Sequence, residues 1–283
     1  MPYMLISYSI VILAIIPFFR KYEKRKPKAR EIVLIAMYTA ITVGAQIFFH
    51  VTVPIQIETA LTIVAGISMG PEVGFLIGAL ARLICNFYLG QGPWTPWQMF
   101  TYGLLGFLAG LAFNKAKAEN KFKIIEDKVT GIEKEKSRTF SIIIGPVLMI
   151  IFGVVVAYVT YLFVPGRDET FFGWRVYAGG LLGLIAGIIV QRKRLPIDNI
   201  TLTVFTFFVA IIIYGGIMNM AAMFTATGLP GGDISWNTLR VLYVSGLPFD
   251  IYHAVTAALS MFVIGKPMIE KIERIKIKYG IYK

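Results

Sequence analysis

The sequence predicts an all-α integral membrane protein. Hydrophobic residues make up 57% of its 283 residues and the mean hydropathy is +0.70, whereas a soluble domain has about 45–50% apolar residues. Apolar runs long enough for membrane helices, which need about 20 residues, recur along the whole chain. The runs are too long and alternate too little for barrel strands, so we expect helices.

Nine spans are predicted, with the N-terminus outside and the C-terminus inside. They cover 4–19, 31–49, 55–69, 72–89, 97–113, 139–163, 174–190, 199–224 and 239–265. The first has no basic segment before it and no small-residue cleavage site after it, which argues against a signal peptide. The third is short, and at about 1.5 Å per residue it barely crosses the membrane or enters it only partly.

The positions of the basic residues support this orientation. Of 28 Lys and Arg residues, 24 lie in the blocks 20–30, 114–138, 191–195 and 266–283. With nine spans, all four blocks fall on one side, as the positive-inside rule requires of the cytoplasm. The net charge of +12 therefore reflects membrane topology, and no nucleic-acid partner is predicted.

One extended polar segment and one internal echo stand out along the chain. Residues 114–138 alternate in charge and are expected to be a solvated cytoplasmic linker. WQMFTYGLLGFLAGL at 97–111 matches WRVYAGGLLGLIAGI at 174–188 in Trp and Gly positions. Two explanations stay open for this internal similarity: duplication of the segment, and convergence of small residues at helix contacts.

A proline-stiffened loop precedes the fifth span. Pro93 and Pro96 fix φ and remove backbone donors, so the loop should hold Trp94 and Trp97 in a defined place. Tryptophan also anchors proteins at membrane interfaces. Substrate contact and interface anchoring therefore both remain open for these two residues.

Further polar and aromatic residues map to the same, outer side. They are Asn86, Tyr88, Gln98, Asn219, Trp236 and Asn237. A few placed hydrogen bonds among aromatic walls suit a small-molecule site, so together with Trp94 and Trp97 they predict a binding cavity that opens outward. Each Asn can equally bond a neighbouring helix.

Few ionisable groups lie inside spans. Arg82 and Asp250 lie at comparable depth and are predicted to form a buried ion pair, with direct substrate contact as the alternative. Removing one partner should cost about 3–5 kcal/mol. Glu58 and Glu72 lie at span ends, where a carboxylate reaches water.

The chain lacks motifs for chemistry of its own. No ATP-binding loop, no His-Glu-x-x-His and no Gly-x-Ser-x-Gly occurs, and His50 and His253 lack metal-site spacing. No enzyme activity, cofactor or metal is therefore predicted. Cys85, the single cysteine, is expected to serve in packing.

Small residues and the tail suggest contact surfaces. Ala36 and Ala40 lie one turn apart on one helix face and allow close approach of another backbone. Gly74 with Gly78 and Gly106 with Gly110 repeat this spacing, which most often packs a bundle. The tail 266–283 is expected to lie along the inner surface as an amphipathic helix, as a lipid anchor or a docking site.

These features resemble a substrate-binding S component of an energy-coupling factor (ECF) vitamin transporter. The resemblance rests on Ala36 with Ala40, on GPWTPWQMFTYGLLGFLAG at 92–110, and on YGGIMN at 214–219 with LPFDIYHAVTAAL at 247–259. It covers 31–113 and 199–280. The loop and the PFD-x-x-H pattern look most like S components linked with cobalamin or other corrinoids, while riboflavin, thiamine and other vitamins stay open.

The resemblance implies a fold, a function and partners. It implies a six-helix core made of 31–113 (helices 1–4) and 199–265 (helices 5–6), in a multi-pass protein of the prokaryotic cell membrane. The chain would bind a vitamin outside and deliver it with a transmembrane coupling subunit and two cytoplasmic ATPases. Ala36 and Ala40 match the positions that contact the coupling subunit.

The chain departs from this family pattern in two places. Residues 1–30 add an N-terminal span with its basic loop, and 114–195 insert the linker and two spans. Two other classes of function stay open. One is an intramembrane enzyme acting on a lipid or prenyl substrate with Arg82, Asp250 and His253. The other is a self-sufficient secondary transporter that uses Asp250 or Glu58 for ion coupling.

Overall fold

The structure is a computed structural model that describes residues 2–113, 178–179, 181–183, 185, 195–226 and 234–281. The predicted linker 114–138 and the predicted span 139–163 lie outside the described residues. So do most of the predicted span 174–190 and most of the second copy of the internal echo.

The described chain is almost entirely helical, which confirms the predicted all-α class. The helices are α1 (Pro2–Lys24), α2 (Ala29–Thr52), α3 (Ile57–Met69), α4 (Pro71–Leu89), α5 (Thr95–Ala112), α8 (Asn199–Val209), α9 (Gly216–Ala226) and α10 (Trp236–Lys278). A π-helical segment, η1 (Ala210–Gly215), joins α8 to α9. Every predicted span within the described residues overlaps one of these helices.

Four helices among the described residues are long and apolar enough to cross a membrane. They are α2, α4, the continuous helix Asn199–Ala226 and α10. This confirms a multi-pass membrane protein, while the total of nine spans stays a prediction. α3 has only 13 residues, all of them buried. It is about 20 Å long at 1.5 Å per residue, short for a membrane span as predicted, and it lies inside the bundle.

Glycine, proline and polar caps set the helix ends. Gly70, with a φ of 100°, separates α3 from α4, and Pro71 begins α4 where no intrahelical donor is needed. Asp198 and Ser235 cap α8 and α10 by accepting hydrogen bonds from the backbone N–H groups of Thr201 and Thr238.

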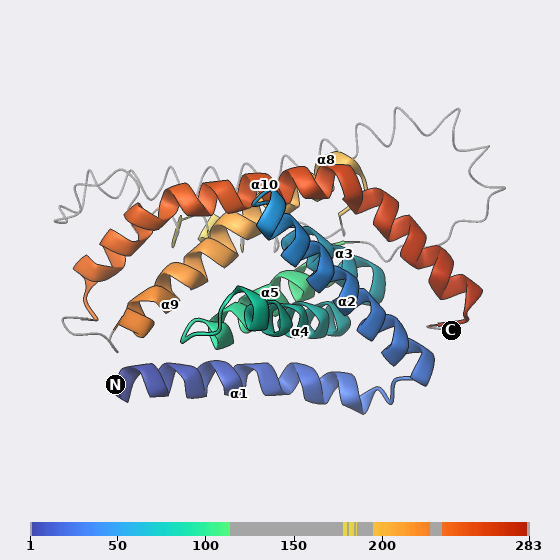
Figure 1. Cartoon of the computed structure of the whole chain (residues 1–283), viewed down its shortest axis with the longest axis horizontal. Coiled ribbons are helices and arrows are strands. Elements are labelled where there is room, and N and C mark those ends of the chain that lie inside the picture. The colour runs from blue at the N-terminus through green and yellow to red at the C-terminus, as the bar shows by residue number, and fades with distance from the viewer. Residues whose placement is uncertain are drawn as a thin grey trace.

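Close glycine contacts join α3, α4 and α5 at the centre of the bundle. A Cβ added at Gly66 or Gly74 would collide with the backbone of Gly106, and one added at Gly78 would collide with the backbone of Tyr102. The glycine pairs found in the sequence therefore pack the bundle, as expected. Figure 1 shows these helices between α1 on one side and α10 on the other.

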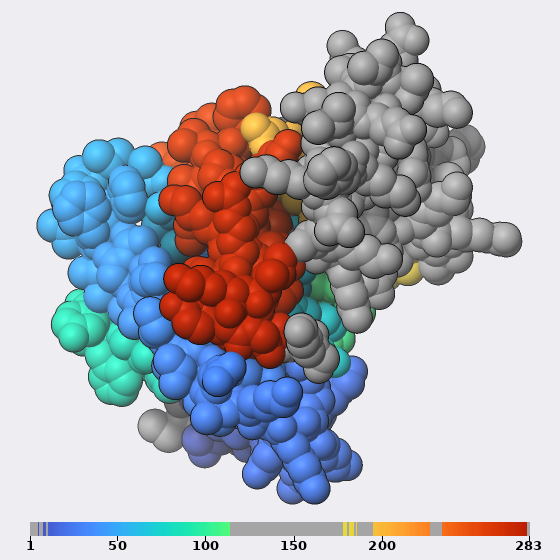
Figure 2. All heavy atoms as spheres, turned by 90° about the vertical axis from the view of Figure 1, so that its right-hand side faces the viewer, coloured from blue at the N-terminus to red at the C-terminus, as the bar shows by residue number. Residues whose placement is uncertain are grey.

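Charged side chains collect at one end of the molecule, which we call the basic end. Lys21 pairs with Glu72 at 2.7 Å, and Arg25 pairs with Glu31 at 3.2 Å. The Arg30 guanidinium donates to the carbonyl of Tyr279 at 3.0 Å. Figure 2 looks onto this end, where the C-terminal part of α10 lies beside the α1–α2 connection.

The opposite end carries the α4–α5 loop, and we call it the Trp94 end. In Figure 1 this loop, the C-terminal end of α9 and the N-terminal end of α10 all lie on the left, and the basic end lies on the right. Of the predicted basic blocks, 20–30 and the described part of 266–283 therefore share one end of the bundle, which agrees with the predicted topology.

The tail is not a separate surface helix, which corrects the expected boundary at residue 266. α10 runs unbroken from Trp236 to Lys278 through Pro267, and Ile269 and Ile272 are buried in the main core. The apolar stripe of the tail thus packs on the protein itself. This packing gives the stripe a partner and lets the helix continue past a proline that favours a kink.

Both additions to the six-helix pattern meet the bundle at defined points. α1 packs on α4 and α5 through Phe18, whose ring stacks on Phe75 at 3.9 Å and meets Phe107 edge-on at 5.0 Å. Phe113 and Leu195 form a bridge in which the Leu195 N–H donates to the carbonyl of Ala112 at 2.8 Å. The two ends of the segment 114–194 therefore lie together.

Candidate functional site

A buried ion pair joins α3 and α4. The Arg82 guanidinium contacts both carboxylate oxygens of Glu58, and its Nε donates at 3.1 Å. Both side chains are buried, and Glu58 is fully so. The predicted partner of Arg82 was Asp250, so that pairing is wrong. Equal depth along two helices does not fix which way each faces, and Arg82 faces α3, not α10.

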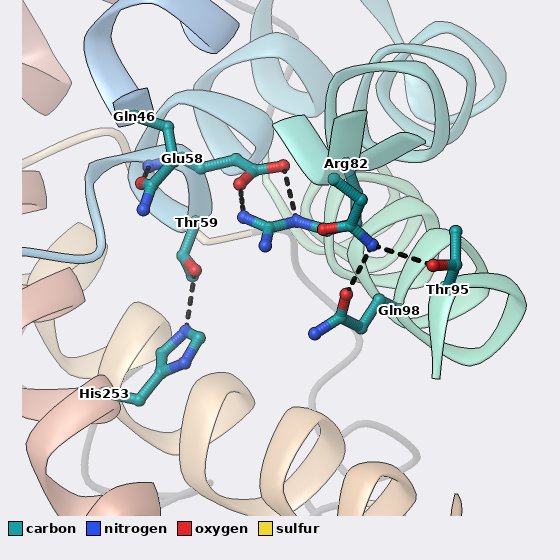
Figure 3. A network of polar contacts seen from close by, with 8 residues as sticks. Gln46, Glu58, Thr59, Arg82, Thr95, Gln98 and His253 are labelled. Atoms are coloured by element: carbon teal, nitrogen blue, oxygen red, sulfur yellow. Dashed lines mark hydrogen bonds and ion pairs between the residues drawn. The ribbon is translucent and has the colours of Figure 1, made fainter. Parts of the chain in front are cut away.

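The first turn of α3 is tied into the same region. The side-chain carbonyl of Gln46 in α2 accepts a hydrogen bond from the Glu58 N–H at 3.0 Å. This satisfies one of the donors that a helix start leaves free. The next residue, Thr59, lies 2.8 Å from His253 Nε2 through its hydroxyl, so α3 is also bonded to α10. Figure 3 shows these contacts from α2, α3, α4 and α10 converging.

Aromatic rings close around this pair. The Arg82 guanidinium lies over the Tyr102 ring, 4.4 Å from its centroid, a cation–π contact. The Tyr214 ring lies 5.3 Å from Tyr102 and 4.1 Å from the His253 ring. Tyr214 belongs to the π-helical segment η1, a rare conformation that often occurs at functional sites.

Asp250 has a different partner, on α9. Asn219 Nδ2 donates to its carboxylate at 2.7 Å. The crossing of these helices is close, because a Cβ added at Gly215 would meet the Asp250 carboxylate and one added at Gly246 would meet Asn219. Asn219, predicted to contact substrate, is therefore buried in a helix–helix contact with Asp250.

Asn86 and Gln98 are brought together, as a shared site requires. The Asn86 amide at the end of α4 donates to the Gln98 side-chain carbonyl at 2.8 Å and to the Thr95 hydroxyl at 3.2 Å (Figure 3). Asn86 is buried and Gln98 is partly exposed. These bonds fix the start of α5 against the end of α4.

Trp97 lies on the inner side of this loop. Its indole stacks on Phe224 of α9, with ring centroids 5.8 Å apart and planes 5° apart. The indole Nε1 is buried and has no hydrogen-bond partner among the residues that the structure describes. A buried donor without an acceptor is costly, so this N–H is available to an acceptor on a ligand.

The remaining predicted contact residues do not join this cluster. Tyr88 and Trp236 are each 72% exposed, and Asn237 is exposed as well. Trp94 is 43% exposed and precedes α5. Interface anchoring explains exposed aromatic residues at this end without a ligand.

Ala36 and Ala40 lie on an open face of α2. Both are exposed, and Ile32, Met37 and Ile41 beside them are each more than half exposed. This face buries nothing among the described residues. It is a flat apolar surface, as a docking helix would need.

Several residues of the cluster were missed from the sequence. Glu58 was assigned to water contact at a span end, Thr59 was not singled out, and Tyr102 and Tyr214 entered only as members of the family motifs. The available signal for Glu58 was its place as the single charged residue of a short span. An intramembrane carboxylate is a functional candidate with a partner to be found.

The side chains of this cluster are polar and mostly uncharged. It offers amide, hydroxyl, indole and imidazole groups together with one neutralised ion pair. Among the described residues no group of three His, Cys, Asp or Glu side chains lies close enough to hold a metal ion. Such a set can orient a polar small molecule between apolar helices.

The fold defines a multi-pass, all-α membrane protein, and two comparisons refine that class. A family model described as "ECF-type riboflavin transporter, S component" matches residues 26–166. The "Probable biotin transporter BioY" of Pyrococcus horikoshii is 33% identical over 104 residues, which covers 32% of this chain and 64% of that protein. No solved structure matches.

The matched family model describes an S component of an ECF transporter, and the matched relative is named as a biotin transporter. They support a transport component and not an enzyme, as the sequence predicted. Neither supports the cobalamin-linked type in particular. The family match ends at residue 166, so Asn219, Asp250 and His253 lie outside it.

Proposed function

We propose that this chain is the substrate-binding subunit of an ECF-type importer and that it binds a vitamin-sized molecule at the Trp94 end. The observation that carries the proposal is a cluster of buried, hydrogen-bonded polar side chains inside an apolar bundle, which reaches the Trp94 end at Asn86. Arg82, Asn86 and His253 are each less than 9% exposed and each hydrogen-bonded. Burying polar groups costs free energy, and a ligand site is a reason to keep them.

The proposed contact region lies between the start of α5 and α9. The free Nε1 of Trp97 offers a donor, and Gln98 offers a partly exposed amide beside it. Tyr214 and His253 form the wall behind them. The remaining predicted contacts, Tyr88, Trp94, Trp236 and Asn237, would line the entrance or anchor it at the membrane surface.

The substrate we favour is a vitamin of the size of biotin or riboflavin. The matched family and the matched relative carry these two names. The sequence pattern favoured cobalamin, but the buried residues at this end are closely packed and hydrogen-bonded to one another. A compact ligand needs less rearrangement of this packing than a corrinoid does.

The delivery step requires partners that supply ATP hydrolysis. The chain has no ATP-binding loop. We propose that the open face of α2 around Ala36 and Ala40 contacts a transmembrane coupling subunit, which in turn holds two ATPases. The small side chains would let the backbone of that subunit approach closely.

Binding can be tested on the purified full-length chain. Mass spectrometry identifies what co-purifies, and quenching of tryptophan fluorescence then ranks biotin, riboflavin and cobalamin. We expect one of the first two to quench at low concentration. Gln98→Ala should weaken that binding, and Gln56→Ala, an amide change outside the region, should not.

Two results would contradict the proposal. The first is the absence of quenching by any vitamin. The second is uptake that continues in cells lacking ATPase partners, because a self-sufficient secondary transporter would behave in that way.

A further inference from the structure

A pocket of about 520 Å³ lies along α1, away from the Trp94 end. Its lining is Leu13, Ile16, Pro17, Arg20, Lys21 and Lys24. These residues follow one another at helical spacing, so one strip of α1 changes from apolar to basic within three turns. The opposite strip faces the bundle, where Val11 is buried and Phe18 stacks on Phe75.

The pocket has two chemically distinct halves. Leu13 and Ile16 are 63% and 37% exposed, and they offer apolar surface without a protein partner over it. Pro17 has no N–H, so the Leu13 carbonyl in the same pocket lacks the donor that a regular helix would supply. Arg20 and Lys24 supply the basic half, one turn apart.

The positive charge of the basic half is available. Neither Arg20 nor Lys24 has an ion-pair or hydrogen-bond partner in the part of the chain that the structure describes. Lys21 is held by Glu72 at 2.7 Å but is still 63% exposed. Glu23, the acidic residue on the same turn, does not line the pocket.

The position of the pocket favours a phospholipid over a soluble anion. It lies where an apolar helix meets the basic end, which is the level at which lipid phosphates meet acyl chains. A soluble anion would use the cations and leave the apolar half empty. A phospholipid uses both, and basic pockets on the inner leaflet are known to hold anionic headgroups.

We propose that this α1 pocket binds an anionic phospholipid, with its phosphate at Arg20 and Lys24 and an acyl chain along Leu13 and Ile16. α1 packs on α4 and α5 through Phe18. A lipid bound there adds to the contacts that hold α1 against the bundle. The inference does not depend on the substrate or on transport.

The test uses the purified full-length chain in a neutral detergent. Native mass spectrometry measures binding of phosphatidylglycerol, of phosphatidylcholine with the same acyl chains, and of glycerol phosphate, which is the headgroup chemistry without chains. The pocket variant is R20Q/K24Q. The matched control, K271Q/R274Q, removes the same charge from exposed positions on α10 at the same end.

We expect phosphatidylglycerol to bind more tightly than phosphatidylcholine, and glycerol phosphate to bind far more weakly than either lipid. R20Q/K24Q should weaken phosphatidylglycerol binding about 30-fold, the equivalent of about 1 kcal/mol for each basic residue. The control should change it less than threefold. The charge-preserving R20K/K24R variant should keep binding, which separates loss of charge from loss of folding.

Three outcomes would overturn the proposal. Equal weakening in the pocket variant and the control would mean a general surface-charge effect. Unchanged binding in R20Q/K24Q would place the lipid elsewhere. Glycerol phosphate binding as tightly as the lipid would make this a site for soluble anions.

Discussion

At the scale of single residues, the buried pair of Glu58 and Arg82 governs the polar cluster. A charge taken out of water needs a partner and further hydrogen bonds. The Glu58 carboxylate pairs with the Arg82 guanidinium, and the guanidinium also lies over the Tyr102 ring. The pair thereby holds α3, α4 and α5 in one arrangement around the site.

Breaking this pair should be costly. Arg82→Gln leaves the fully buried Glu58 carboxylate uncompensated, and we expect a loss of about 3–5 kcal/mol in the free energy of unfolding. Equilibrium unfolding in detergent measures it. In a double-mutant cycle, E58Q/R82Q should lose much less than the sum of the single changes.

The control cycle pairs Arg82→Gln with Asp250→Asn. We expect these two changes to be nearly additive, because Asp250 accepts a hydrogen bond from Asn219 and Arg82 pairs with Glu58. Strong coupling of Arg82 to Asp250, with none to Glu58, would contradict the observed pairing.

The indole N–H of Trp97 should contribute to ligand binding if the proposed site is right. Trp97→Phe keeps an aromatic ring against Phe224 but removes the donor. A hydrogen bond contributes about 0.5–1.5 kcal/mol, so the dissociation constant of the identified vitamin should rise roughly 2- to 12-fold. Equilibrium dialysis measures it without relying on fluorescence.

Trp94→Phe is the matched control for this change, since Trp94 is 43% exposed. It should alter the dissociation constant less than twofold. Equal effects of both changes would mean that Trp97 acts only as a general aromatic surface.

At the scale of helices, direct backbone contacts hold α3, α4 and α5 together beside the site. Gly66, Gly74 and Gly106 let three backbones meet with no side chain between them. Helices that approach this closely gain contact area, and they tolerate no added volume.

Gly106→Ala should therefore destabilise the bundle although alanine is the better helix former. Its Cβ would collide with the backbone of Gly74, which cannot move away as a side chain can. Overpacking of this kind costs about 1–3 kcal/mol. The same unfolding measurement applies.

Gly44→Ala serves as the comparison, because a Cβ there meets nothing within 4 Å. It should be neutral or stabilising by up to about 1 kcal/mol, the helix propensity difference. Equal destabilisation by both changes would mean that a collision with the Gly74 backbone is not the reason for the effect at Gly106.

The open face of α2 leads to a transport prediction. Ala36→Trp places a large side chain on a face that touches nothing among the described residues, so folding and vitamin binding should persist while uptake falls sharply. Val51→Trp, on the same helix at a position 77% exposed, should leave uptake intact. Normal uptake with Ala36→Trp would remove this face from the proposed docking surface.

The helices were largely predictable from sequence, and the site was predictable only in part. Span length and hydropathy located α2, α4 and α10, because lipid forces apolar runs into helices. Asn86 and Gln98 were predicted to lie on the same side from their places near span ends, and the structure brings the two side chains together. The Glu58–Arg82 pair was not, because partner choice depends on helix rotation, which hydropathy does not encode.

At the scale of the whole molecule, the bundle has two unlike ends. The basic end carries exposed cations such as Arg20, Lys21 and Lys24, and the Trp94 end has buried polar groups such as Asn86. Exposed charges resist transfer across a membrane and therefore fix the orientation of the chain. Buried and neutralised polar groups do not have this effect. The basic end should therefore face the cytoplasm and the Trp94 end the outside.

This orientation can be tested by thiol labelling of intact cells. Cys85 is the single cysteine and is buried, so Cys85→Ala gives a background that a membrane-impermeant maleimide does not label. Gln91→Cys, in the loop before Trp94, should then react in intact cells. Lys28→Cys, in the α1–α2 connection, should react only after the membrane is opened. The reverse pattern would place the polar cluster nearest the cytoplasm, and capture of a vitamin from outside would be excluded.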